Sequence, residues 1–459
     1  MANKLLTKLQ GILDSKNDIK FALREKGVSI SDTDPFSKYP SKVMEINNRM
    51  SIIYHDMILV ITENFTNFEN LFKWSNWVTN IPGLPSENVT TMKSMCEGCN
   101  LITEFPDMSF DSVETTNSMF KGCSKLSTMP TLNLSNVSDT SSMFENCSSI
   151  TEATIVTSDK LKKTTSMFSG CNKLTQYPNI NFKNVTEASG TFRNCSSLVT
   201  IPNTINTTNC TDLSNLFYGC RKLKALMSID TSSATTLKAL FRGCNSLISV
   251  PTLSTSKCVD FESMLQDCSA ITTVPELDFT NAKIISHLLD GCSSITEAPN
   301  WDTSNITHAE GTFMYTSISE VPEYDWTNLT HGADMFSNCE NITVIPNLNT
   351  PNLSVCKSMF YNSKNLTRIE GIDVSKISPN TTEYQDMFLE CDALEYVKIN
   401  STDSRRLILV LETLPSFEGF DLSRVCDISD CSDDVKNAVK SDITDGLLLI
   451  PNCWTIKYK

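Results

Sequence analysis

The stretch N-V-S-D-T-S-S-M-F-E-N-C-S-S-I, residues 136–150, recurs along the chain with a nearly constant period. Aligned on its cysteine, Cys147, the same position returns every 24 residues, apart from single steps of 25, 23 and 28. This period lies within the 20–29 residues of leucine-rich repeats, so it predicts a solenoid whose coils bury their apolar faces only against each other. The 14 aligned positions are Ser75, Cys99, Cys123, Cys147, Cys171, Cys195, Cys220, Cys244, Cys268, Cys292, Thr316, Cys339, Ser363 and Cys391.

Two repeat positions predict the core of the coil. Phenylalanine stands three residues before the cysteine position in 11 of the 14 units. A free thiol packs as a small apolar side chain, so we expect a buried thiol column rather than disulfides or metal ligands. The only C-x-x-C, Cys96–Cys99, has no second pair at zinc-ligand spacing. The expected core includes Phe120, Cys123, Phe144, Cys147, Phe168, Cys171, Phe192 and Cys195.

The other positions of the repeat unit predict how the backbone runs within one coil. A P-x-Φ-x-Φ pattern, as at residues 130–134, predicts a short strand with one buried face and an opening proline where a donor is least needed. Asparagine stands eleven residues before the cysteine position in 10 of 14 units, where its amide can satisfy turn backbone groups. The spacing of Val, Thr, Met and Phe over 137–144 predicts a helical turn on the outer side.

The exposed x positions of these strands form the candidate binding face. In the middle and late coils acid follows acid at neighbouring strand positions, so we expect either solvent screening or a cation or basic partner to relieve the repulsion. The residues of this face are Glu276, Asp278, Asn300, Trp301, Asp302, Glu323, Asp325 and Trp326.

The ends of the chain differ from the repeats. Residues 1–50 contain a predicted helix over about 5–26, ended by Gly27, which either caps the first coil or serves docking and oligomerisation. Residues 51–62 predict a strand, residues 51–400 the solenoid, and residues 401–459 an α+β cap. The expected fold class is therefore a leucine-rich-repeat-like solenoid with a helical N-terminal segment.

Composition excludes several classes of function. The net charge of −15 disfavours nucleic-acid binding, which needs a basic face. The N-terminus lacks a signal-peptide pattern and no apolar run reaches about 18 residues, so we expect neither export by a visible signal nor membrane insertion. The histidines, His55, His287, His308 and His331, are assigned to unrelated repeat positions, so no catalytic residue, metal or cofactor is expected.

The repeat over about residues 60–400 resembles the units of BspA-type leucine-rich-repeat surface proteins of bacteria, which read like S-N-V-T-x-M-x-x-M-F-x-G-C-x-x-L. The Asn, Met-Phe, Cys and Leu positions of residues 136–150 carry this likeness. The resemblance implies a solenoid and, as one alternative, a bacterial surface adhesin.

Residues 16–43, from K-N-D-I-K-F-A-L-R-E-K-G-V to F-S-K-Y-P-S-K-V, are similar to the start of phage structural and tail-fibre proteins. This resemblance implies a non-enzymatic virion component of the particle surface. It would dock to other virion proteins through residues 1–50, present the solenoid to a host glycan or protein, and form a homo-oligomer. The enzymatic alternative, a glycan-degrading tailspike, would need a carboxylate pair about 5–10 Å apart.

Overall fold

The computed structural model describes residues 66–81, 83–378, 382–416, 424–448, 450–451 and 453–459. They divide into two compact units, one of residues up to 161 together with 178–180, and one of residues 162–177 together with 181–459. The helix, strand and docking segment predicted over residues 1–62 lie outside the described residues.

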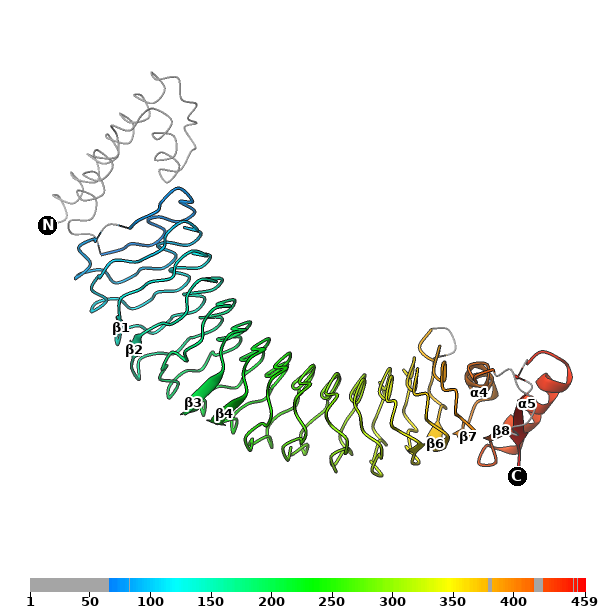
Figure 1. The fold of residues 1–459 in the computed structure, drawn as a ribbon. Helices are drawn as coiled ribbons and strands as arrows, with labels where there is room; N and C mark the ends of the chain where they lie inside the picture. The colour runs from blue at the N-terminus through cyan, green and yellow to red at the C-terminus, as the bar shows by residue number, and fades with distance from the viewer. Residues whose placement is uncertain (1–65, 82, 379–381, 417–423, 449, 452) are drawn as a thin grey trace, which may run out of the picture. The chain divides into compact units, whose positions relative to one another are not determined.

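Both units are parallel solenoids in which each coil adds one turn of backbone beside the last, as the period predicted (Figure 1). Parallel bridges join equivalent residues of successive coils. In the first unit they link Asn67, Thr91, Thr115 and Asp139, and in the second they run from Lys163 to Val355. The predicted repeat solenoid is therefore confirmed.

Regular strands form in some coils only. In the first unit β1 (Leu132–Leu134) pairs with β2 (Ile155–Thr157). In the second unit β3 (Thr200–Ile205) pairs with β4 (Ala225–Ile229), and a five-stranded parallel sheet contains β5 (Val344–Ile345), β6 (Arg368–Asp373), β7 (Tyr396–Asn400), β8 (Arg424–Asp427) and β9 (Trp454–Lys457).

Proline limits which coils form ladders, and strands form in some coils only, which corrects the expectation of a strand in every coil. Among the described strands every paired set includes at least one proline-free segment, namely β2, β4 or β6 to β9. Where consecutive coils all carry the opening proline, as at Pro251, Pro275 and Pro299, the chain is extended but assigned no strand. Proline has no N–H to donate, so two adjacent coils that both begin their strand segment with proline lack a backbone hydrogen bond at the same position of the ladder.

The segment predicted as a helical turn is instead a series of overlapping turns. The N–H groups of Met119, Lys121 and Cys123 donate to carbonyls three residues back, whereas those of Ser118 and Gly122 donate to the next coil at 2.8 and 2.7 Å. Ser118 and Gly122 have φ of 55° and 77°, in the left-handed region. A right-handed helix excludes this conformation, so the helical prediction was wrong.

The predicted core residues are buried. Phe120, Cys123, Phe144, Cys147, Phe168, Cys171, Phe192 and Cys195 all have 0% exposure. The rings stack from coil to coil, with centroids 5.4 Å apart for Phe120 and Phe144 and 5.7 Å apart for Phe192 and Phe217.

No disulfide joins the 18 cysteines, and 17 of them are buried. The side chains at the aligned position share one kind of hydrogen bond. The thiol of Cys195 donates to the carbonyl of Phe168 in the preceding coil at 3.2 Å, and the hydroxyl of Ser363 donates to that of Phe336 at 2.7 Å. Serine can therefore replace cysteine at this position because it keeps both the small volume and the donor.

The asparagine position also bridges coils. The side-chain amides of Asn136, Asn281 and Asn328 donate to backbone carbonyls of the preceding coil at 2.6, 2.7 and 2.7 Å. The amide thus satisfies turn backbone groups as predicted, but those of the neighbouring coil rather than its own.

The C-terminal part of the second unit contains two helices, α4 (Ser404–Leu411) and α5 (Asp433–Thr444). Asp403 caps α4 by accepting from two backbone N–H groups, and Ser432 caps α5. Strands β8 and β9 extend the sheet of the solenoid beside them (Figure 1).

We expect Phe192→Ala to lower the free energy of unfolding by about 3–5 kcal/mol, because it leaves a cavity between the rings of Phe168 and Phe217. Chemical denaturation followed by circular dichroism measures this loss. Met227→Ala, at a side chain that is 65% exposed, is the control and should change stability by less than about 0.5 kcal/mol. Equal effects of the two variants would contradict a buried phenylalanine column.

We also expect the native protein to show a single reactive thiol, that of Cys453, the one cysteine that is not buried. Burial raises the pKa of interior thiols such as Cys220, to about 12, and the thiolate is the reacting form. Titration with a disulfide reagent at pH 8 should detect one thiol before unfolding and 18 after it. Cys453→Ser should remove the native signal, and fast labelling of several thiols would show an open core.

Candidate functional site

The predicted strand face is only partly as expected. Glu276, Asp278, Asn300, Asp302, Glu323 and Asp325 are exposed. Trp301 and Trp326 are buried, at 7% and 0% exposure, so their place on the face was wrong. Both occupy Φ positions of the strand pattern, which point inward, and the ring of Trp301 packs 5.1 Å from that of Phe279.

The aspartates of this face are held by their own turns. Asp278 accepts from the backbone N–H and the hydroxyl of Thr280 at 2.9 and 2.6 Å, and Asp325 does the same with Thr327 at 3.0 and 2.5 Å. The side-chain hydrogen bonds lower the pKa of both aspartates. Local donors therefore stabilise these charges, and the acidic stripe does not by itself require a bound cation.

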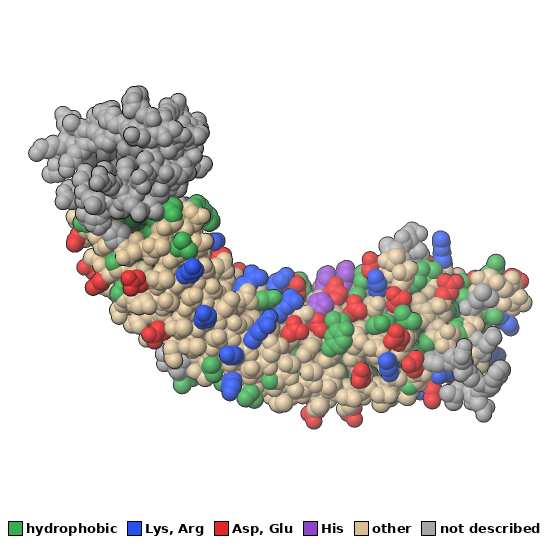
Figure 2. Space-filling view, turned by 45° about the horizontal axis from the view of Figure 1, so that its top comes forward, with side chains coloured by type: hydrophobic (Ala, Val, Ile, Leu, Met, Phe, Trp, Pro, Cys, Tyr) green, Lys and Arg blue, Asp and Glu red, His purple; other side chains and the backbone are tan. Residues whose placement is uncertain are grey.

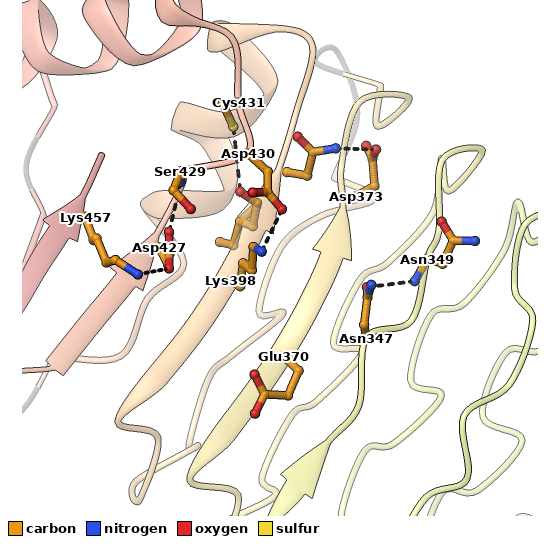
Figure 3. Close-up of polar contacts among 12 residues, drawn as sticks. Asn347, Asn349, Glu370, Asp373, Lys398, Asp427, Ser429, Asp430, Cys431 and Lys457 are labelled. Atoms are coloured by element: carbon orange, nitrogen blue, oxygen red, sulfur yellow. Dashed lines mark hydrogen bonds and ion pairs between the residues drawn. The ribbon is translucent and has the colours of Figure 1, made fainter. Parts of the chain in front are cut away.

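A polar hollow of about 120 Å³ lies further along the same face, where β6 and β7 meet the segment after β8 (Figure 3). Its lining residues are Asn347, Asn349, Glu370, Gly371, Ile372, Asp373, Lys398, Asn400 and Asp430.

Gly371 leaves room at the edge of the hollow for the side chain of Asn347. Gly371 lies 24 residues after Asn347, at the equivalent strand position of the next coil. A Cβ atom at residue 371 would lie 2.4 Å from Oδ1 and 2.9 Å from Cγ of Asn347. Any other residue here would therefore displace Asn347 and fill the space.

Charged groups around the hollow are paired with one another. The ammonium of Lys398 lies 2.6 Å from Asp430, which raises the pKa of Lys398. Asp373 accepts from the amide of Asn400 at 2.9 Å, and Glu370 accepts from Arg368 at 2.5 Å. Donors and acceptors are thus held in fixed directions on one surface (Figure 3).

A second polar network supports the hollow from the side of β8. Asp427 accepts from Lys457 at 2.7 Å, from the Ser429 N–H at 2.9 Å and from the Tyr396 hydroxyl at 3.1 Å. Burial alone would raise the pKa of Asp427, but these hydrogen bonds outweigh it and hold the pKa well below its usual range. The guanidinium of Arg368 lies 3.7 Å above the Tyr396 ring. These contacts fix β7 and β8 next to the hollow.

The hollow lies on later coils than the predicted binding face, whose role in binding stays a prediction. The P-x-Φ-x-Φ pattern also gives Asn347 and Asn349 as strand-face positions, and one period later it reaches Gly371 and Asp373. The sequence signal for the hollow was Gly371, a glycine at a strand position where most other coils carry a larger residue. Asp430 carried none, because it follows the insertion that contains α4 and is outside the repeat.

The histidine assignment needs correction as well. His308 and His331 both stand eight residues before the aligned position, at Thr316 and Cys339, and a parallel bridge joins them. They are therefore equivalent neighbours rather than residues at unrelated positions. The sequence alone shows that the two histidines are equivalent, because both stand the same number of residues before the aligned cysteine position.

Comparisons with known proteins add the following. No curated protein matches the sequence. Among solved structures, a leucine-rich repeat protein of Bacteroides ovatus is similar at 16% identity and a TM-score of 0.38, over 78% of this chain and 87% of that one. A leucine-rich cell surface protein of Faecalibacterium prausnitzii is similar at 15% identity and a TM-score of 0.38, over 70% and 87%. In the part of the chain that the structure describes, no helix has the length and apolar character to cross a bilayer.

The family comparison covers most of the chain. One family model matches residues 48–157, 162–279 and 283–401, which together hold the repeats. The match begins at residue 48, so the phage-like resemblance of residues 16–43 stays a prediction. The chain belongs to the family described as Mycoplasma protein of unknown function, DUF285.

Proposed function

We propose that the chain is a non-enzymatic binding protein whose solenoid presents its strand face, and the polar hollow in it, to a hydroxyl-rich ligand such as a surface glycan. The hollow at Gly371 carries this proposal. It joins three amides, three carboxylates and one ammonium around a space that fits part of a sugar ring.

The chemistry of the hollow favours a polyol over other ligands. Asn347, Asn349 and Asn400 each supply donors and an acceptor, Asp373 supplies acceptors and Lys398 supplies donors. Neighbouring hydroxyls of a sugar both donate and accept, so they match this mixture. The local excess of carboxylates disfavours an anionic ligand such as a phosphate group.

The partners of the carboxylates support binding rather than hydrolysis. Glu370, Asp373 and Asp430 are engaged by Arg368, Asn400 and Lys398 respectively. A glycosidase needs one carboxyl group to donate a proton while a second acts as nucleophile or base. Carboxylates already held by cations and amides are better suited to orienting a ligand than to transferring protons.

The bacterial surface is the location that we propose with this function. The family description names Mycoplasma, which supports a bacterial protein over a virion component. Residues 401–459, which supply Asp430, are proposed in addition to cap the sheet at its C-terminal end. Docking through residues 1–50 and homo-oligomer formation stay predictions.

We expect Gly371→Val to weaken binding of the glycan at least about tenfold, equal to about 1.4 kcal/mol, because the side chain fills the hollow. An array of defined oligosaccharides identifies the ligand, and calorimetric titration measures its affinity. Lys398→Met should weaken binding through the loss of a donor.

The control for the lysine variant is Lys222→Met, at an exposed lysine in a turn outside the strand face, which should bind with unchanged affinity. Circular dichroism verifies that each variant is folded. Equal affinity of Gly371→Val and the parent would contradict binding in the hollow. Release of reducing ends from the bound glycan would overturn the non-enzymatic part of the proposal.

A further inference from the structure

The three described histidines lie at one place on the second unit, among acidic side chains (Figure 2). The rings of His308 and His331 stack with centroids 4.3 Å apart and planes 10° apart. Ligand atoms of these two residues and of Glu310 all lie within 4.8 Å of one another, on half-buried side chains. We propose that His308, Glu310 and His331 bind a divalent transition-metal ion, for which Zn²⁺ is the probe.

The threonine before each histidine selects the tautomer that a metal requires. The Thr307 hydroxyl donates to the carbonyl of Lys283 at 3.1 Å, and that of Thr330 donates to the carbonyl of Thr307 at 2.9 Å. Each hydroxyl has a single proton, so its oxygen must accept from the histidine Nδ1, 2.9 Å away in both cases. Both Nδ1 atoms therefore carry hydrogen, and both Nε2 atoms present a lone pair.

This arrangement is the one that supports histidine ligands in metal sites. A ligating imidazole donates its other N–H to an outer acceptor, which fixes the ring orientation and raises its basicity. Here the acceptor is repeated in two successive coils, so the rings are oriented in parallel. Two imidazoles with lone pairs on the same side are better stabilised by a cation than by each other.

Glu310 is the third ligand because the adjacent coils carry no lysine at its repeat position, where a lysine pairs with a glutamate elsewhere in the solenoid. At the same repeat position, Glu262 is paired with Lys238 of the adjacent coil at 2.6 Å. The equivalent neighbours of Glu310 are Ser286 and Ala333. Ser286 donates a hydrogen bond to Oε2 of Glu310, so the carboxylate is oriented but its charge is not neutralised by a lysine at this position.

The donor set indicates the class of metal. Two imidazole nitrogens and one carboxylate oxygen are typical of zinc sites that keep an open position, whereas calcium and magnesium prefer oxygen alone. A tetrahedral zinc ion with bonds of about 2.0–2.1 Å needs ligand atoms about 3.4 Å apart, so the two stacked rings and Glu310 must turn toward a common point when the ion binds. The bound ion would connect neighbouring coils.

The nearby His287 is not part of the site. Its Nδ1 lies 3.1 Å from Asp290, and this hydrogen bond raises the pKa of His287. Asp290 also accepts from Gln266 at 2.7 Å. His287 is therefore engaged by a local hydrogen bond to Asp290, which makes it the control for non-specific metal binding by histidine.

Isothermal titration of the full chain with Zn²⁺ should show one site per chain. His308→Ala and His331→Ala should abolish it, whereas His287→Ala should retain it. Titration with Co²⁺ distinguishes this site from the cysteines, because nitrogen and oxygen ligands give weak visible bands without an intense sulfur charge-transfer band.

The threonine support has its own test. Thr330→Val should lower the Zn²⁺ affinity about 10–100-fold, as expected for an outer acceptor. Thr235→Val, at the same repeat position in a coil without histidine, should leave the affinity unchanged. Zn²⁺ should raise the melting temperature of the parent but not of His308→Ala. Absence of a one-to-one site, equal binding by His308→Ala, or a thiolate spectrum would each overturn the proposal.

Discussion

The structure depends on backbone hydrogen bonds that alternate between a coil and its neighbour. In the turn segment, Ser118 and Gly122 donate across to the next coil while Met119 and Lys121 donate within their own turns. The alternation needs left-handed residues at two positions of the repeat, which Ser, Asn and Gly usually provide. A coil without a neighbour leaves half of these donors unpaired, so the coils are stable only as a stack.

This register brings equivalent residues together, and the core follows from it. Rings of Phe192 and Phe217 must meet because both stand three residues before an aligned position, and each thiol must reach the same carbonyl of the preceding coil. The two candidate sites arise in the same way from departures from the repeat. Glycine at position 371 leaves room for the side chain of Asn347 at the edge of the hollow, and histidine in two successive coils creates the pair at His308 and His331.

The solenoid and its interior were predictable from the period alone, because burial at Phe144 or Cys147 is a property of the repeat position. The turn segment was predicted as a helix because its apolar spacing fits one equally well, although the Gly or Asn before the aligned position, as at Gly122 and Asn146, favours a left-handed turn. Trp301 was placed on the exposed strand face because of its chemistry, although its Φ position in the strand pattern predicts that the side chain points inward. The hollow could not be derived, because Asp430 reaches it only through the path of the chain around α4.

Proline separates two kinds of strand face, and most of the residues around the hollow lie on the proline-free one. Coils that open with Pro251, Pro275 and Pro299 are assigned no strand, so their faces depend on side-chain bridges such as that from Thr255 to the Asp278 carbonyl. Strands β6 to β9 contain no proline and pair in parallel, with one shift of register between Ile369 and Ile372 of β6. A binding site gains from support that holds its groups in place before the ligand arrives. The proline-free strands β6 and β7 therefore supply Asp373 and Lys398 to the hollow, and Gly371 leaves room beside them for the side chain of Asn347.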